Sequence, residues 1–100
     1  MKPIIISTIA LTLSLPVYAE RNIKQEIIDR CRSEMGSHGA AMVKACVDMD
    51  IEAVNALTKY PEQHKPIISR CMRNMESHGY AMVKACADMD IEAEDSLSNY

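Results

Sequence analysis

Four cysteines are the residues best suited to chemistry in this chain of 100 amino acids. They form two pairs with the same spacing, Cys31 with Cys46 and Cys71 with Cys86, and fourteen residues separate the members of each pair. Reactive dithiols usually lie two residues apart beside a helix N-terminus, and four cysteines at this spacing do not match a zinc pattern. An even number of cysteines in a short chain therefore indicates structural disulfide bonds.

Methionine and histidine are the next candidates, because thioether sulfur suits Cu(I) and imidazole is the commonest metal ligand. The possible ligands are His38, His78, Met35, Met42, Met75 and Met82. The chain has no Phe and no Trp, and most of its methionines follow the apolar stripes described below, where an adaptable side chain fills a core. We therefore predict a core role for the methionines and no metal or cofactor, with copper binding as the alternative.

An acidic segment at residues 48–52 recurs at residues 88–92. It lacks the Gly and Glu that a calcium loop requires at its sixth and twelfth positions. Asp50 and Asp90 each lie at the edge of an apolar helical stripe, and a partly buried carboxylate needs a partner. We predict structural ion pairs of Asp50 and Asp90 with Arg30 and Arg70, which are also present in both copies.

The spacing of these groups follows from an internal repeat. Residues 21–60 and 61–100 align without a gap and are identical at 22 of 40 positions, so one supersecondary unit is used twice. Each unit contains two apolar stripes with helical periodicity. We expect helices near residues 22–35, 40–58, 66–75 and 80–97.

Helix ends can be placed from the turn residues. Ser37 and Ser77 are predicted N-caps, and Gly39 and Gly79 suit a backbone conformation that other residues avoid. Pro66 fits the first turn of the third helix, where a missing N–H costs nothing.

Folding each unit into an αα-hairpin about residues 38–39 places Cys31 opposite Cys46, and the same geometry pairs Cys71 with Cys86. Each bridge would close a loop of about 15 residues and contribute roughly 3 kcal/mol in the chain-entropy model. A domain this small buries only a thin core, so such bridges matter for its stability. Cross-repeat pairing, with Cys31 bonded to Cys71 or Cys86, is the alternative.

The N-terminus has the pattern of a secretory signal peptide at residues 1–19. Lys2 is followed by an apolar run and by Val17-Tyr18-Ala19, a typical cleavage site. A retained membrane anchor is the alternative, although the run is short for a span of roughly 20 residues. We predict a periplasmic or secreted protein whose residues 20–100 form a single helical domain, without a membrane contact after cleavage.

Charge narrows the choice of partners. Cleavage would remove Lys2 and leave 10 Lys and Arg against 14 Asp and Glu, a net charge of about −4. Nucleic-acid binding depends on Lys and Arg that neutralise phosphates, so we predict no nucleic-acid partner.

The pattern Cys-x3-Met-Gly-x2-Gly-x2-Met-Val-Lys-Ala-Cys-Val-Asp-x-Asp, from Cys31 to Asp50, resembles a repeat of small exported bacterial proteins of unassigned function. The resemblance extends over both units. It implies an exported, disulfide-linked helical module, and it implies no activity.

The sequence thus predicts an all-α fold of two tandem disulfide-linked αα-hairpins with four short helices. No Ser or Cys has a nearby base supported by a third group, so we expect a non-enzymatic protein. The expected function is binding of a protein partner. A copper-binding protein and a secreted inhibitor or toxin are the alternatives.

Overall fold

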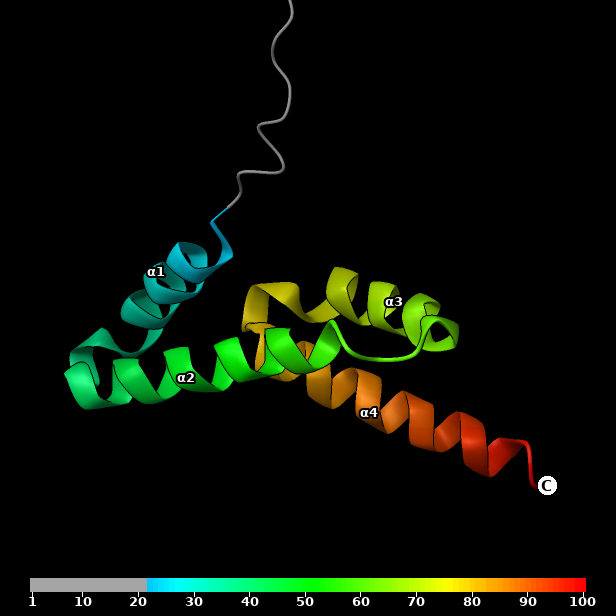
Figure 1. The fold of residues 1–100 in the computed structure, drawn as a ribbon. Coiled ribbons are helices and arrows are strands. Elements are labelled where there is room, and N and C mark those ends of the chain that lie inside the picture. The colour runs from blue at the N-terminus through cyan, green and yellow to red at the C-terminus, as the bar shows by residue number, and fades with distance from the viewer. Residues whose placement is uncertain (1–21) are drawn as a thin grey trace, which may run out of the picture.

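The computed structural model describes residues 22–100, and every regular element among them is helical (Figure 1). The predicted all-α fold is therefore confirmed for this part of the chain, whereas the predicted signal peptide lies outside it. The four helices are α1 (Ile23–Met35), α2 (Ala40–Leu57), α3 (Lys65–Met75) and α4 (Tyr80–Leu97). Three single-turn 3-10 helices connect them: η2 (Gly36–His38), η3 (Glu62–His64) and η4 (Glu76–His78).

Each repeat folds into a hairpin that one disulfide bond holds together. Cys31 is bonded to Cys46 and Cys71 to Cys86, with a Cα–Cα distance of 5.8 Å in both pairs. The predicted pairing within each repeat is confirmed, and the cross-repeat alternative is wrong. The first bridge joins α1 to α2 and the second joins α3 to α4, so no disulfide bond links the two hairpins.

Two glycines begin the second helix of each hairpin. Gly39 and Gly79 are the N-caps of α2 and α4, and both have a φ of 103°, in a region that is nearly exclusive to glycine. The prediction that Ser37 and Ser77 are N-caps is wrong. Both serines lie inside a 3-10 turn, and this additional turn moves the start of each long helix beyond the glycine. Pro66 lies in the first turn of α3, as predicted.

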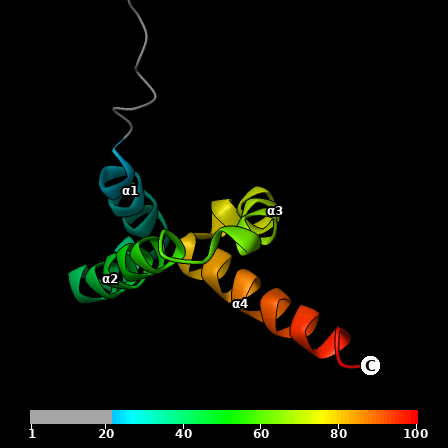
Figure 2. The same ribbon diagram turned by 45° about the vertical axis from the view of Figure 1, so that its right-hand side comes forward.

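The hairpins pack against each other mainly through their long helices, α2 and α4 (Figures 1 and 2). One buried cluster contains Ile27, Cys31 and Ala53 of the first hairpin together with Tyr80, the first residue of α4. A second cluster, formed by Cys71, Val83 and Ala87, lies within the second hairpin. Tyr80 thus joins the core of the neighbouring hairpin rather than that of its own.

Methionine does not fill the core as fully as the sequence suggests. Four methionines on the long helices are 44% to 69% exposed: Met42, Met49, Met82 and Met89. Met35, Met72 and Met75 are partly buried. The prediction of a methionine core is therefore wrong for the long helices. Their buried face is rotated toward Asp50 on α2 and toward Val83 on α4, which leaves the methionine side of each helix in solvent.

Candidate functional site: the junction between the hairpins

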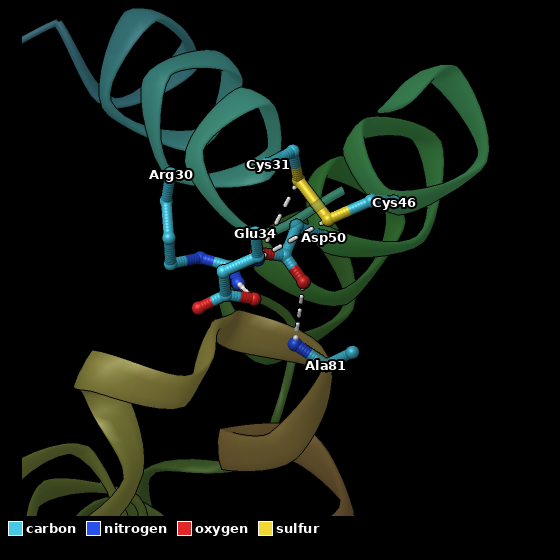
Figure 3. The surroundings of a disulfide bond; sticks show 6 residues. All are labelled: Arg30, Cys31, Glu34, Cys46, Asp50 and Ala81. Atoms are coloured by element: carbon cyan, nitrogen blue, oxygen red, sulfur yellow. Dashed lines mark hydrogen bonds and ion pairs between the residues drawn. A yellow bond between two sulfur atoms is a disulfide. The ribbon is translucent and has the colours of Figure 1, made fainter. Parts of the chain in front are cut away.

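A buried ion pair lies where the two hairpins meet. Arg30 of α1 donates from Nη2 to Oδ2 of Asp50 on α2, and Asp50 is only 2% exposed (Figure 3). The other guanidinium nitrogen of Arg30, Nη1, binds Glu34 Oε1 at 2.6 Å. Nη2 also lies 3.6 Å from both sulfur atoms of the Cys31–Cys46 bridge. Burial lowers the pKa of Arg30, but the hydrogen bonds and charges of Asp50 and Glu34 outweigh it and leave this pKa above its usual value.

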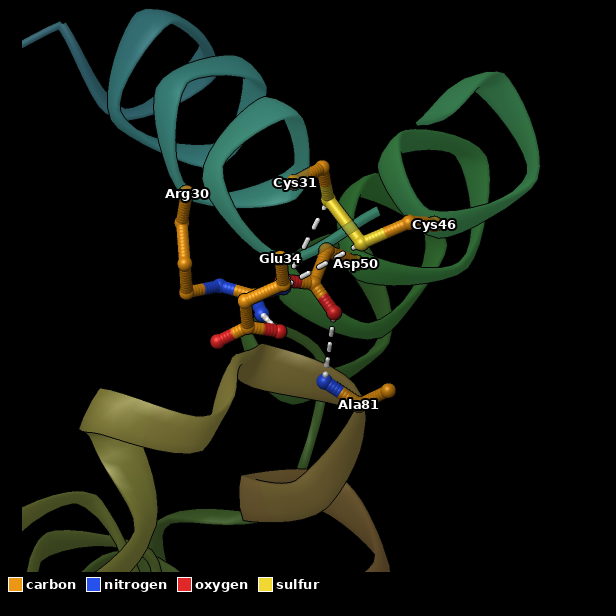
Figure 4. A network of polar contacts seen from close by, with 6 residues as sticks. All are labelled: Arg30, Cys31, Glu34, Cys46, Asp50 and Ala81. Atoms are coloured by element: carbon orange, nitrogen blue, oxygen red, sulfur yellow. Dashed lines mark hydrogen bonds and ion pairs between the residues drawn. A yellow bond between two sulfur atoms is a disulfide. The ribbon is translucent and has the colours of Figure 1, made fainter. Parts of the chain in front are cut away.

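The same carboxylate reaches across to the second hairpin. Oδ1 of Asp50 accepts the backbone N–H of Ala81, at 3.1 Å (Figure 4). Ala81 lies in the first turn of α4, where backbone N–H groups lack partners within the helix and a negative charge is favourable. Asp50 therefore acts as a capping residue supplied by the neighbouring hairpin.

Gly79 makes room for this contact. A Cβ atom on Gly79 would lie 2.5 Å from Arg30 Nη2 and 2.9 Å from Asp50 Oδ2. The ion pair is thus seated directly on the η4–α4 turn, and only glycine fits beneath it.

The equivalent groups at the two outer ends of the repeat are open. Arg70 and Asp90 form the corresponding ion pair, but their side chains are 47% and 41% exposed. Within residues 22–100, nothing beyond its chain neighbours lies within 4 Å of a Cβ built on Gly39.

A second polar contact joins Tyr60, at the end of the first hairpin, to α4. The hydroxyl of Tyr60 donates to Asp88 Oδ1, and Lys84 Nζ binds Asp88 Oδ2 at 2.8 Å. Burial raises the pKa of Tyr60, and the hydrogen bond and charge of Asp88 raise it further. For Asp88, burial raises the pKa, but the hydrogen bonds from Lys84 and Tyr60 outweigh it and place this pKa below its usual value.

Besides a small groove of 170 Å³ beside Arg30 and Gly79, two larger grooves border the junction. The larger, which we name the apolar groove, has a volume of 480 Å³ and is lined by Ile23, Val54, Leu57, Thr58, Tyr60, Lys65, Ile68, Ser69, Met72 and Tyr80. The smaller, which we name the α2–α4 groove, has a volume of 270 Å³ and is lined by Met49, Glu52, Ala53, Ala81, Lys84, Ala85 and Asp88.

The sequence did not predict that the two hairpins dock through this junction. Pairing of Asp50 with Arg30 and of Asp90 with Arg70 follows from the helical pattern, but the docking of the hairpins does not. One signal was present: Tyr80 replaces Ala40 at the start of a long helix, where an aromatic residue has little to contact within its own hairpin.

The candidate metal ligands lie in two sets around the hairpin turns, Met35, His38 and Met42 at η2 and Met75, His78 and Met82 at η4. His38 and His78 are exposed at the ends of η2 and η4. Within residues 22–100, one group of His, Cys, Asp or Glu side chains has its ligand atoms close together, namely Cys71, Cys86 and Asp90. The two sulfur atoms in this group are joined in a disulfide bond and are no longer thiolate ligands. Copper binding through thioethers stays a prediction.

No protein-family model, curated protein or solved structure matches this chain. The resemblance to exported bacterial repeat proteins therefore stays a prediction. In the part of the chain that is described, no helix is both long and apolar enough to cross a membrane. The fold and the junction together define a small disulfide-linked helical repeat protein.

Proposed function

We propose that the protein is an exported, non-enzymatic binding module whose apolar groove receives an apolar side chain from a protein partner. The observation that carries this proposal is the groove itself, which is bordered by side chains of both hairpins and has a volume of 480 Å³. Recognition sites commonly combine a concave apolar surface with a few polar groups at the edge.

The lining favours an aliphatic or aromatic occupant. Ile23, Val54, Leu57 and Ile68 supply aliphatic walls, and Met72 supplies a flexible, polarizable one that adapts to the shape of a guest. The groove also lies next to polar side chains, among them Thr58, Lys65 and Ser69. A partner helix with one exposed apolar anchor fits this arrangement.

Two further observations support a binding role outside the cytosol. All four cysteines are in disulfide bonds, which persist in oxidising compartments and leave no thiol as a nucleophile. Two acidic groups at the junction are already engaged, Asp50 with Arg30 and Asp88 with Lys84. These contacts favour structural roles for groups that could otherwise serve as acids or bases.

Substitution of one serine tests the groove. Ser69 is exposed at its edge, so Ser69→Trp would fill the groove without altering the buried clusters. Ser33→Trp is the matched control, because Ser33 is an exposed residue of α1 outside the apolar groove. The three proteins would be immobilised and exposed to the exported proteome of the native cell, with bound proteins identified by mass spectrometry.

We expect one partner to be retained by the natural protein and by Ser33→Trp, and to be lost with Ser69→Trp. Equal retention by both variants would exclude the groove as the binding site. Absence of any partner that the natural protein retains above background would contradict the binding function.

A further inference from the structure

The junction has two sides, and the repeat places a second copy of each side at an end of the molecule. In the junction, the Arg30–Asp50 pair of the first hairpin is seated on the Gly79 turn of the second. The second hairpin carries its own pair, Arg70–Asp90, and the first hairpin carries its own turn at Gly39. We name the surface around Arg70, Met89, Asp90 and Ala93 the tail face, and the surface around residues 39–48 the head face.

The lining residues of the α2–α4 groove are all preserved in these two faces. On the first-hairpin side, the three lining residues recur after 40 positions as Met89, Glu92 and Ala93 of the tail face. On the second-hairpin side, the four lining residues recur 40 positions earlier as Ala41, Lys44, Ala45 and Asp48 of the head face. Over the repeat as a whole, only 22 of 40 positions are identical. Both halves of a complementary contact are therefore present, one at each end.

The tyrosine contact is also duplicated. Tyr60 donates its hydroxyl proton to Asp88, which Lys84 binds as well. Forty residues away, Tyr100 is fully exposed, and Asp48 is bound by Lys44 at 2.7 Å in the same arrangement. If a second copy docked as the two hairpins dock, Tyr100 of one molecule would face Asp48 of the other, as Tyr60 faces Asp88.

The tail face is apolar where the junction is apolar. Met89 is 69% exposed and Leu97 is 60% exposed. Leu57, the counterpart of Leu97, is partly buried and lines the apolar groove of the junction. Met49, the counterpart of Met89, lines the α2–α4 groove and stays 59% exposed there. Docking of a second copy in the same manner would therefore cover Leu97 and leave Met89 largely in solvent.

Some junction residues differ between the two repeats, and their counterparts at the outer faces are complementary in charge instead of both being apolar. Val54 and Met72 both border the buried cluster at the junction and line its apolar groove. The counterpart of Val54 is Glu94 in the tail face, and that of Met72 is Arg32, on the hairpin that carries the head face. An apolar pair in the junction thus corresponds to two residues of opposite charge at the outer faces. Tyr80 is replaced by Ala40, which removes the largest buried side chain from the contact. An interface built from these residues would be weaker than the internal junction and more sensitive to salt.

We propose that a second copy of this chain docks head to tail, with the tail face of one molecule on the head face of the next. The Arg70–Asp90 pair is seated on the Gly39 turn, and Asp90 accepts the backbone N–H of Ala41, as Asp50 accepts that of Ala81. Such an interface is heterologous, because it uses two different surfaces, and it leaves one head and one tail free. It therefore builds short open chains or a closed ring. This proposal uses a different surface from the apolar groove and is independent of the proposed partner.

Two variants, each altered on one face, test the geometry. Ala93→Glu alters the tail face and Ala41→Glu alters the head face. Both alanines are exposed in the monomer, whereas their counterparts in the junction, Ala53 and Ala81, are buried and partly buried. The protein would be purified in its exported form, and its molar mass measured by analytical ultracentrifugation between micromolar and millimolar concentrations. Circular dichroism and mass spectrometry would establish that each variant keeps its helices and both disulfide bonds.

The natural protein is expected to show a mass that rises with concentration beyond that of a dimer, unless a ring closes. Each single variant stays monomeric, because one of its faces is blocked. A mixture of the two forms a dimer, since the intact head of one fits the intact tail of the other, and its mass doubles and then stops rising.

Three results would overturn the proposal: a natural protein that is monomeric at every concentration, a single variant that still self-associates, or a mixture that stays monomeric. The first would mean that the charged changes at the outer faces cap the array. The second would indicate a symmetric interface between like faces.

Discussion

Replacement of each turn glycine by alanine separates the cost of the backbone conformation from the cost of disturbing the ion pair. Gly39 and Gly79 have the same φ of 103°, so alanine at either position has the same unfavourable backbone. The two sites differ in their surroundings. A Cβ at residue 39 meets nothing within 4 Å among the described residues, whereas a Cβ at residue 79 meets the Arg30–Asp50 pair.

The expected difference follows from these contacts. A residue other than glycine in this backbone region costs about 1–3 kcal/mol, and this cost applies to both variants. In Gly79→Ala the contact at 2.5 Å must also displace the guanidinium of Arg30. Loss of one partner from a buried ion pair costs about 3–5 kcal/mol, and a guanidinium that can shift loses part of this, about 2 kcal/mol. Gly79→Ala should therefore destabilise the protein by about 2 kcal/mol more than Gly39→Ala does.

The assay is equilibrium unfolding in urea with the disulfide bonds intact, followed by circular dichroism at concentrations low enough to keep the protein monomeric. The free energies of unfolding of the two variants are compared with that of the natural protein, and equal denaturant dependence would establish that the same surface unfolds. Equal destabilisation by the two substitutions would refute the reasoning. It would mean that the close packing of the Arg30–Asp50 pair on Gly79 adds nothing to the free energy of unfolding.

Three other predictions follow from the junction and the bridges. Asp50→Asn should lower the free energy of unfolding by about 2–4 kcal/mol, because it removes the buried counter-charge of Arg30 and leaves only the more exposed Glu34. Asp90→Asn, at an exposed pair, should cost less than about 1 kcal/mol in the monomer. Tyr60→Phe should remove the stabilisation that the Tyr60–Asp88 hydrogen bond provides between a lower and an upper pH limit. The measurement is the free energy of unfolding of both proteins over a range of pH. The lowered pKa of Asp88 makes the contribution present above its usual 3.8 and lost as the pH falls through the folded value, and the raised pKa of Tyr60 makes it present below its usual 10.0 and lost as the pH rises through the folded value. Reduction of both disulfide bonds should remove roughly 6 kcal/mol and unfold most of the helical structure, seen as a loss of the circular dichroism signal; a reduced protein that keeps its full helical signal would contradict this.

The helices and the bridges could be predicted because they depend on local spacing. Cysteines fifteen residues apart, on either side of a turn, meet whenever the two arms are helical, and the observed bonds are Cys31–Cys46 and Cys71–Cys86. Because the unit is duplicated, the same argument applies to both bridges.

The burial of α2 could not be predicted as well, because it depends on the neighbouring hairpin. From the sequence, Met49 lies closer to the centre of the apolar stripe than Asp50 does. In the structure Asp50 is buried and Met49 is 59% exposed. The carboxylate of Asp50 has two partners, Arg30 and the backbone N–H of Ala81, and the second of these exists only once the hairpins have docked. Hydrophobic periodicity alone contains no information about such a partner.

The position of the sulfur bridges bears on how the chain is oxidised as it is made. Each bond closes a short local loop, with its two cysteines 15 positions apart, and needs no residue from the other hairpin. A chain that emerges with its N-terminus first can therefore complete its first bridge before Cys71 has appeared, which limits the opportunity for mispairing. Local closure of this kind favours the two bonds within the hairpins over the other two connectivities that four thiols allow.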